Sequence, residues 1–220
     1  MEKLIIYGNK SVARGAYSGF RRNPKYEVVA FTVDREYLEG DRFCDLPIVP
    51  FDTVKNEFPP EAHRMFIAVG YVGANKIRKE RYLRSKEMGY RLVSAVNPTA
   101  IVNPEMTIGE NCIVGPFAVV SESARIGNNV FISTACTIGH DVVIGDHCFL
   151  SDGVSVGGSV SIGARSYLGI RSIIRNKVSI GNDCVIGAGA LMLQDAEDGC
   201  VYMGEPATLL PISSDKLPLG

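Results

Sequence analysis

Residues 136–165 read CTIGHD VVIGDH CFLSDG VSVGGS VSIGAR, and the same six-residue period runs without interruption from residue 100 to residue 195. The third place of each block is aliphatic, for example Ile138, Ile144 and Leu150, and the fourth place is Gly in ten of the sixteen blocks. A fixed period sustained over this many blocks predicts a solenoid, in which each repeat packs only against its neighbours.

The length of the block predicts short strands joined by tight corners. Side chains alternate along a strand, so the aliphatic third place and the residue two places earlier are both expected to point inward. Three blocks would then form a triangular coil, and successive coils would stack at about 4.8 Å. We expect Gly at the fourth place because it adopts corner backbone angles that cost other residues energy. A long amphipathic helix is disfavoured because its period would be about 3.6 residues.

Residues 1–98 do not follow the six-residue period. In this part, short apolar segments that suit strands alternate with segments that suit helices. This alternation predicts a small parallel α/β domain of the Rossmann-like type, with its ligand crevice at the carboxyl ends of the strands. Gly8, Asp34 and Gly70 end three of these strands. Asp34 suits a ribose hydroxyl or a simple turn, and the sequence favours neither. The expected strands cover 3–8, 26–34, 47–51, 63–70 and 91–96, and the expected helices cover 11–22, 52–57 and 75–90.

Net charge, apolar runs and cysteine positions indicate which partners and which cellular location to expect. The formal net charge of −1 implies neither a nucleic acid nor a membrane as partner. The chain opens directly into the strand-like MEKLIIYG and contains no apolar run of about eighteen residues, so we expect a cytoplasmic protein. The first place of a block is taken by four of the six cysteines, where other blocks carry Ala or Val, and these are expected to be reduced core residues: Cys112, Cys136, Cys148 and Cys184.

The candidate chemistry lies at a corner of the repeat. His140 takes the fifth place of its block, so its side chain is expected to point outward, and Gly158 occupies the equivalent place one coil later. Asp141 follows His140 and could orient the ring. This arrangement suits a general base beside a backbone N–H that stabilises an oxyanion. An ordinary exposed corner histidine explains the sequence equally well.

The remaining polar residues of the repeat give weaker signals. His147 takes the sixth place of its block and is expected to stack on Asn129 and Arg165, in a lining or merely hydrogen-bonded role. Two histidines seven residues apart on different faces do not predict a zinc site. Basic residues crowd the later coils and could meet the phosphates of a coenzyme, although a solvated charged surface remains an alternative: Arg165, Arg171, Arg175 and Lys177.

The blocks IGHD (138–141) and IGDH (144–147), with GAGA (187–190) and a closing GEPA (204–207), resemble the left-handed β-helix acyltransferases. Together with the preceding α/β domain, the chain resembles the sugar O-/N-acyltransferase family, which includes the sialic acid O-acetyltransferase and bacillosamine N-acetyltransferase types. The resemblance covers about residues 1–210, and IAVG (67–70) followed by IR (77–78) adds to it. It implies a left-handed coil, a homotrimer with active sites between neighbouring coils, and acetyl-CoA as the co-substrate without a metal.

The resemblance also implies roles for particular residues. His140 is the general base with Asp141 beside it, and the N–H of Gly158 meets the thioester carbonyl. It implies that acetyl-CoA contacts Gly158, Gly187 and Ala188, and the charge of Arg171 adds this residue to the predicted contacts. It also implies that a nucleotide-linked sugar contacts Gly8, Asp34 and Gly70, and the predicted site further includes Asn9 and His147. The family commonly carries Gly-His-Gly where this chain has Ser11, Val12 and Ala13, and several members carry Asn near the catalytic His where this chain has Ser133.

These inferences predict three parts: a sugar-nucleotide domain at 1–98, an all-β left-handed parallel β-helix at 99–195, and a tail at 196–220. The predicted function is N-acetylation of an amino group on a nucleotide-linked deoxysugar, by direct attack on acetyl-CoA. An O-acetyltransferase acting on a sugar hydroxyl, of the sialic acid type, is a close alternative. A non-catalytic trimeric scaffold that binds a ligand is the alternative from another class.

Overall fold

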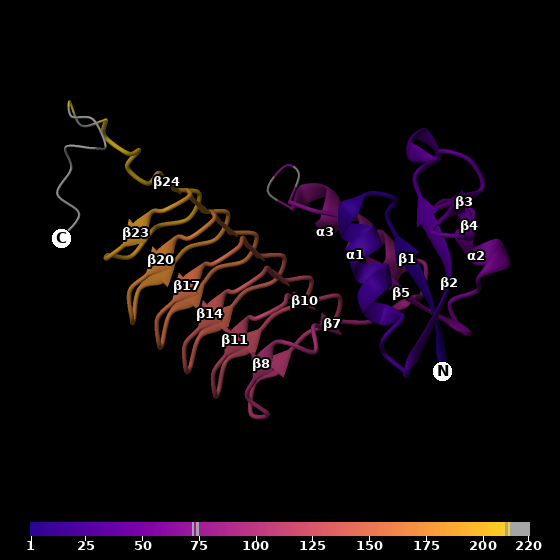
Figure 1. The fold of residues 1–220 in the computed structure, drawn as a ribbon, viewed down its shortest axis with the longest axis horizontal. Helices are drawn as coiled ribbons and strands as arrows, with labels where there is room; N and C mark the ends of the chain where they lie inside the picture. Colours follow the sequence, from indigo (N-terminus) through magenta and orange to yellow (C-terminus); the bar gives the residue numbers. More distant parts are fainter. Residues whose placement is uncertain (72, 74, 210, 212–220) are drawn as a thin grey trace.

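The computed structural model describes residues 1–71, 73, 75–209 and 211. It combines an N-terminal α/β unit with a long triangular coil of short strands (Figure 1). The unit lies beside the first coils, and the described chain ends beyond the last ones. Among the described residues, no helix is long and apolar enough to cross a bilayer.

The N-terminal unit is built on one sheet in the order β3-β4-β2-β1-β5-β6. All pairs are parallel except the hairpin of β3 with β4. The alternation of strand and helix predicted from the sequence is therefore confirmed. The elements are β1 (Glu2–Tyr7), α1 (Ser11–Phe20), β2 (Tyr26–Val33), the 3₁₀ helix η1 (Arg35–Tyr37), β3 (Arg42–Phe43), β4 (Leu46–Pro50), α2 (Val54–Glu57), β5 (His63–Ile67), α3 (Lys76–Glu87) and β6 (Arg91–Leu92).

One predicted strand is two. The sequence predicted a single strand over residues 91–96, but Arg91–Leu92 pairs with β5 whereas Ala95–Val96 pairs with Ile113–Val114 of the coil. Apolar residues run through the whole segment, so periodicity did not reveal that the chain leaves one sheet for another. The coil thus begins before the predicted boundary at residue 98.

The coil has three faces, each a parallel sheet in which strands eighteen residues apart pair, such as Thr137 with Ser155. The first face contains β7 (Ala95–Val96), β10 (Ile113–Val114), β13 (Phe131–Ile132), β16 (Phe149–Leu150), β19 (Tyr167–Leu168), β22 (Val185–Ile186) and β24 (Val201–Tyr202). The second face contains β8 (Ile101–Val102), β11 (Val119–Val120), β14 (Thr137–Ile138), β17 (Ser155–Val156), β20 (Ile173–Ile174) and β23 (Leu191–Met192). The third face contains β9 (Thr107–Ile108), β12 (Arg125–Ile126), β15 (Val143–Ile144), β18 (Ser161–Ile162) and β21 (Ser179–Ile180).

Pairing continues past residue 195. Ala196 bridges to Ile180, and β24 pairs with β22, so part of the predicted tail completes the last coil. The corners between the faces form three edges. We call them edge I (first to second face), edge II (second to third face) and edge III (third face to the first face of the next coil).

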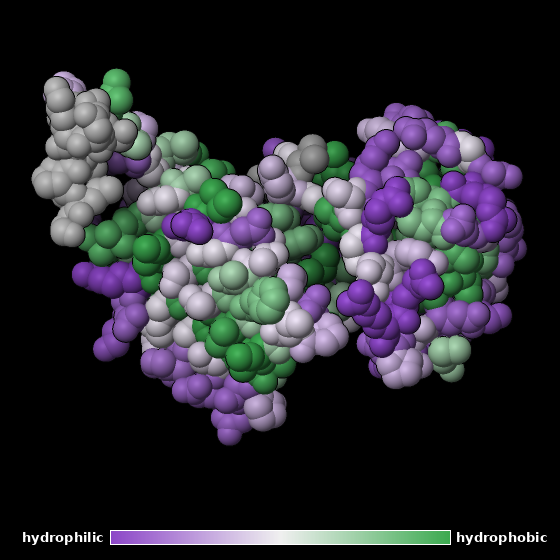
Figure 2. Space-filling view, in the orientation of Figure 1, coloured by the Kyte–Doolittle hydropathy of each residue, from purple (hydrophilic) through white to green (hydrophobic). Residues whose placement is uncertain are grey.

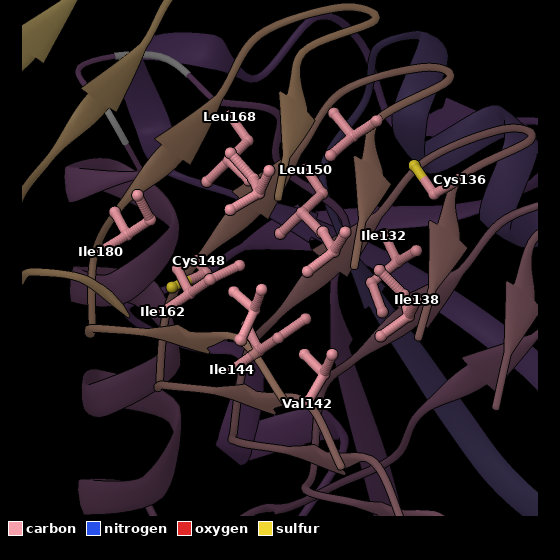
Figure 3. Packing of buried hydrophobic residues seen from close by; sticks show 14 of the residues in the cluster. Ile132, Cys136, Ile138, Val142, Ile144, Cys148, Leu150, Ile162, Leu168 and Ile180 are labelled. Atoms are coloured by element: carbon pink, nitrogen blue, oxygen red, sulfur yellow. The ribbon is translucent and has the colours of Figure 1, made fainter. Parts of the chain in front are cut away.

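The interior of the coil is filled as the repeat predicted. Ile132, Ile138 and Leu150 point into it and are at most 1% exposed (Figure 3). Burying such a side chain stabilises the fold by about 1.5–3 kcal/mol before conformational entropy is subtracted. Cys136 and Cys148 lie in the same core, and all six cysteines are free thiols. Burial raises the pKa of the Cys148 thiol to about 12, which suppresses the reactive thiolate.

The reason expected for the repeated glycines is wrong. Positive φ angles fall on the sixth place of the blocks, at residues such as Asn129 (57°) and Asp141 (57°), and not on the fourth-place glycines. Gly is needed at the fourth place because coils stack closely there. A Cβ on Gly163 would lie 2.5 Å from the backbone nitrogen of Asn182 in the next coil.

Candidate active site

The corner that carries His140 lies on edge II, between β14 and β15. The ring nitrogen Nδ1 of His140 lies 2.8 Å from Oδ2 of Asp141, and both side chains are more than half exposed. This hydrogen bond lets the carboxylate accept the Nδ1 proton, which leaves Nε2 as the basic nitrogen. The geometry therefore brings together the pair that the sequence selected.

Gly158 lies directly beneath this ring. A Cβ on Gly158 would lie 2.7 Å from Cε1 of His140 and closer still to Nε2, so the imidazole rests against the bare α-carbon. The backbone N–H of Gly158 has no hydrogen-bond partner within the described chain. The equivalent N–H of His140 one turn earlier is likewise unpaired within the described residues, whereas that of Ala164 on edge III donates to Asn182 Oδ1 at 2.9 Å. The corner thus offers a base and an unpaired amide side by side.

The other predicted coenzyme contacts lie on a different edge of the same β-strand domain, in later turns than His140. Gly187 and Ala188 form the edge I corner between β22 and β23, and Arg171 lies one coil earlier on that edge. Arg171 and Ala188 are exposed, whereas Gly187 is buried against Tyr202 and Met203. Edges I and II border the second face on opposite sides. A single chain therefore does not bring these residues together with His140.

The predicted acceptor contacts gather at the carboxyl ends of the strands. Gly8 directly follows β1 and has a φ of 129°, and a Cβ there would lie 2.7 Å from the carbonyl oxygen of Ala68. Only glycine fits this close approach. Gly70 lies near Val12 of α1, and Asn9 donates from Nδ2 to the carbonyl oxygen of Tyr37 at 2.7 Å.

Asp34 directly follows β2 and is held by two side chains of the N-terminal unit. Its Oδ2 accepts a hydrogen bond from Tyr7 at 2.9 Å and from Nε of Arg81 at 2.8 Å, and its side chain is 16% exposed. Burial, together with the hydrogen bond to Asp34, raises the pKa of Tyr7 to about 12, so the phenol stays protonated and donates. Both of these bonds fall on Oδ2.

His147, which was predicted to contact the sugar, is buried where the N-terminal unit meets the β-helix. Its side chain is 7% exposed, and its Nδ1 lies 2.9 Å from Nδ2 of Asn129, within a ladder of residues on edge III. Asn75 of the N-terminal unit donates to the His147 carbonyl oxygen at 2.7 Å. Burial lowers the pKa of His147 to about 4, so the ring is neutral. His147 holds the two parts of the chain together, which is the hydrogen-bonded role that the sequence also allowed.

His147 and its expected neighbour Asn129 belong to a larger group, in which Asn111 and Arg78 were not selected from the sequence as site residues. Asn111, Asn129 and His147 occur at a spacing of eighteen, and Asn111 donates from Nδ2 to Asn129 Oδ1 at 2.7 Å. That spacing was a readable signal, because identical places in successive coils must touch. Arg78 of α3 joins the same group and carried no such signal.

Comparison with known proteins agrees with this description. A family model described as the GMPPB C-terminal domain matches residues 96–190, which is the repeat alone. No curated protein sequence matches the chain closely enough to be informative.

Solved structures resemble the chain over nearly its full length. A perosamine N-acetyltransferase from Caulobacter crescentus, in complex with CoA and GDP-perosamine, has a TM-score of 0.83 at 26% identity, covering 94% of this chain and 95% of that one. The acetyltransferase domain of PglB from Neisseria gonorrhoeae, in complex with acetyl coenzyme A, has a TM-score of 0.83 at 25% identity, covering 95% and 99%. WeeI from Acinetobacter baumannii shares the fold at 21% identity with a TM-score of 0.80, covering 94% and 99%.

These structures confirm the resemblance predicted from the repeat. The parallel sheets match those of the left-handed β-helix acetyltransferases, and the chain has the fold of the hexapeptide-repeat sugar N-acetyltransferases. The class of protein that fold and site define is an acyltransferase. Its predicted co-substrate agrees with the two first-named structures, which hold a coenzyme A or its acetyl form.

Proposed function

We propose that this protein transfers an acetyl group from acetyl-CoA to the amino group of a nucleotide-linked deoxysugar. The observation that carries the proposal is the His140 ring, held by Asp141 and resting on Gly158, with Nε2 and an unpaired amide at one corner. The two similar structures with CoA or acetyl-CoA, one of which also holds GDP-perosamine, support the choice of substrates.

In the proposed mechanism the sugar amine attacks the thioester carbonyl carbon directly. Nε2 of His140 takes the proton that the amine loses, and Asp141 stabilises the imidazolium that results. The Gly158 N–H donates to the oxyanion of the tetrahedral intermediate. The C–S bond then breaks, and the coenzyme A sulfur leaves with the proton returned from His140. The repeat cysteines are buried in the core, so no acyl-cysteine is invoked.

The N-terminal unit is proposed to hold the sugar nucleotide. Its mostly parallel sheet supports a Rossmann-like function, since ligands of such sheets bind at the carboxyl ends of the strands. The Asp34 carboxylate, fixed by Tyr7 and Arg81, has Oδ1 available for a ribose hydroxyl. Gly8, Asn9 and Gly70 supply backbone and amide groups at the same strand ends.

A homotrimer completes the proposed site. The second face exposes Ile101 (69%), Ile173 (48%) and Leu191 (57%), and Figure 2 shows hydrophobic groups on this side of the coil. If this face packs against a second copy, edge II of one copy approaches edge I of the next. That seam would unite His140 with the coenzyme contacts Gly187, Ala188 and Arg171. A cytoplasmic location, where acetyl-CoA and nucleotide sugars are made, belongs to the same proposal.

Transfer to a sugar hydroxyl is the second candidate function. It is favoured by the same His140 geometry, because a hydroxyl must also lose a proton during attack. A panel of nucleotide-linked amino and hydroxy sugars, assayed with acetyl-CoA for release of the free thiol, separates the two. Acetylation of hydroxy sugars alone would replace the proposed N-acetylation, and binding of ligands without turnover of any sugar would favour the scaffold.

His140→Ala tests the role of the base. We expect kcat to fall by about 10²–10⁴-fold, the range for a lost general base. The oligomer and the affinity for coenzyme A should be unchanged, as measured by light scattering and calorimetry. Wild-type turnover by this variant would refute the assignment.

A further inference from the structure

Arg78 of α3 is a buried cation without a counter-ion. Its side chain is fully inaccessible, and no carboxylate of the described chain lies within ion-pair distance of it. Burial lowers its pKa to about 10, so the guanidinium remains charged at neutral pH. Taking a charge out of water without an ion pair is costly, and an apolar side chain of similar size would avoid that cost. The hydrogen bonds that Arg78 donates explain why an arginine occupies this buried position.

The guanidinium bridges the two parts of the chain. Its Nη1 donates to the carbonyl oxygens of Ile67 at 2.8 Å and Val69 at 3.4 Å, at the end of β5. Its Nη2 donates to the carbonyl oxygen of Asn111, on edge III of the coil, at 2.6 Å. Its Cζ also lies 5.6 Å from the ring centroid of Phe131 on the first face.

A second link runs beside the first. Asn111 Oδ1 accepts the backbone N–H of Ile67 at 2.7 Å, and Asn111 is itself held by Asn129. Ile67 is thus bound through both its N–H and its carbonyl to groups that touch one corner of the coil. Gly70 follows three residues later. The carboxyl end of β5, which lies next to the predicted acceptor site, is therefore the part of the sheet that is hydrogen-bonded to the coil, directly and through Arg78.

We propose that Arg78 is a positioning residue, which fixes the acceptor-binding strand ends at one orientation to the coil and so places the acceptor amine for attack. This inference rests on the proposed function, because it assigns the acceptor to the N-terminal unit and the chemistry to the coil. Three carbonyl oxygens on two parts of the chain need a planar fork of donors, which arginine supplies and lysine does not.

Arg78→Lys is the test. Nucleotide contacts lie within the N-terminal unit and coenzyme contacts within the coil, so each substrate should still bind. We expect kcat to fall by about 10–100-fold, because a misplacement of about 1 Å costs roughly 10²-fold. The KM for the acceptor and the affinity for coenzyme A should stay within about threefold of wild type. Asn111→Ala, which breaks the parallel link, should lower kcat in the same way and serves if Arg78→Lys does not fold.

Arg64→Lys is the matched control. Arg64 lies on the same strand β5 but forms an ion pair with Glu2 at the opposite end of the sheet. The kcat of Arg64→Lys should therefore equal that of the wild-type protein. An unchanged kcat in Arg78→Lys overturns the inference, as does a loss confined to the acceptor KM, which would show a purely local role at the strand end. Absence of acetyl transfer by the wild-type protein would instead refute the proposed function.

Discussion

Gly158→Ala separates the chemistry of edge II from the stability of the coil. The added methyl group would lie 2.7 Å from Cε1 of His140, so the ring must move away. The His140 side chain is 54% exposed and can rotate into solvent, so the substitution should change the free energy of unfolding little. Displacing the base by about 1 Å is expected to lower kcat by roughly 10²-fold. The melting temperature should fall little.

Gly163→Ala is the partner variant. Its methyl group would meet backbone nitrogen of Asn182 at 2.5 Å, and backbone cannot swing aside. We expect this variant to lose about 1–3 kcal/mol of unfolding free energy, the usual cost of overpacking. The protein that remains folded should keep its kcat, because Gly163 lies neither at the His140 corner nor at the Asn111 corner that Arg78 contacts. Steady-state kinetics and urea unfolding of both variants measure the contrast. Full activity in Gly158→Ala would refute the reasoning that packing against the α-carbon of Gly158 holds His140 in position for catalysis.

Two further predictions concern the N-terminal unit and its junction with the coil. Asp34→Asn should raise the KM for the nucleotide sugar about 10–100-fold and leave the KM for acetyl-CoA unchanged, because a charged hydrogen bond contributes about 1.5–3 kcal/mol. Glu2→Gln, at the far end of the sheet, is its control, and equal effects in both variants would contradict the role of Asp34. The folded pKa of His147, about 4, lies below the ordinary value of 6.5, so the unfolded chain takes up the proton first as the pH falls. Wild-type stability should therefore decline from about pH 6.5 to about pH 4, and urea titrations of His147→Gln should show a flatter profile; an equal slope would contradict burial of a neutral ring.

The sequence predicted most of the coil because its determinants are periodic. Counting eighteen residues placed Gly158 beside His140, and the structure has them in contact. The same counting placed His147 on Asn129, but it did not reveal which edge faces the N-terminal unit. The sequence therefore did not show that His147 lies in a buried junction.

Other features leave little trace in a single sequence. Arg78 appears as one basic residue in a charged helix, and its partners are carbonyl oxygens, which every residue possesses. The ion pair of Asp34 with Arg81 joins positions forty-seven residues apart with no shared period. The stacking role of the fourth-place glycines required the distance between coils at each corner, which periodicity alone does not give.

The separation of His140 and Gly187 onto different edges constrains how this chain can change its length. An insertion or deletion of six residues between them would shift every later residue by one face. Gly187 would then no longer lie on edge I. A change of eighteen residues preserves the edge and shifts only the height. The sequence can therefore gain or lose three blocks at a time. Gain or loss of a single block would preserve the hydrophobic interior but would separate the two groups of residues that meet in the proposed seam between copies.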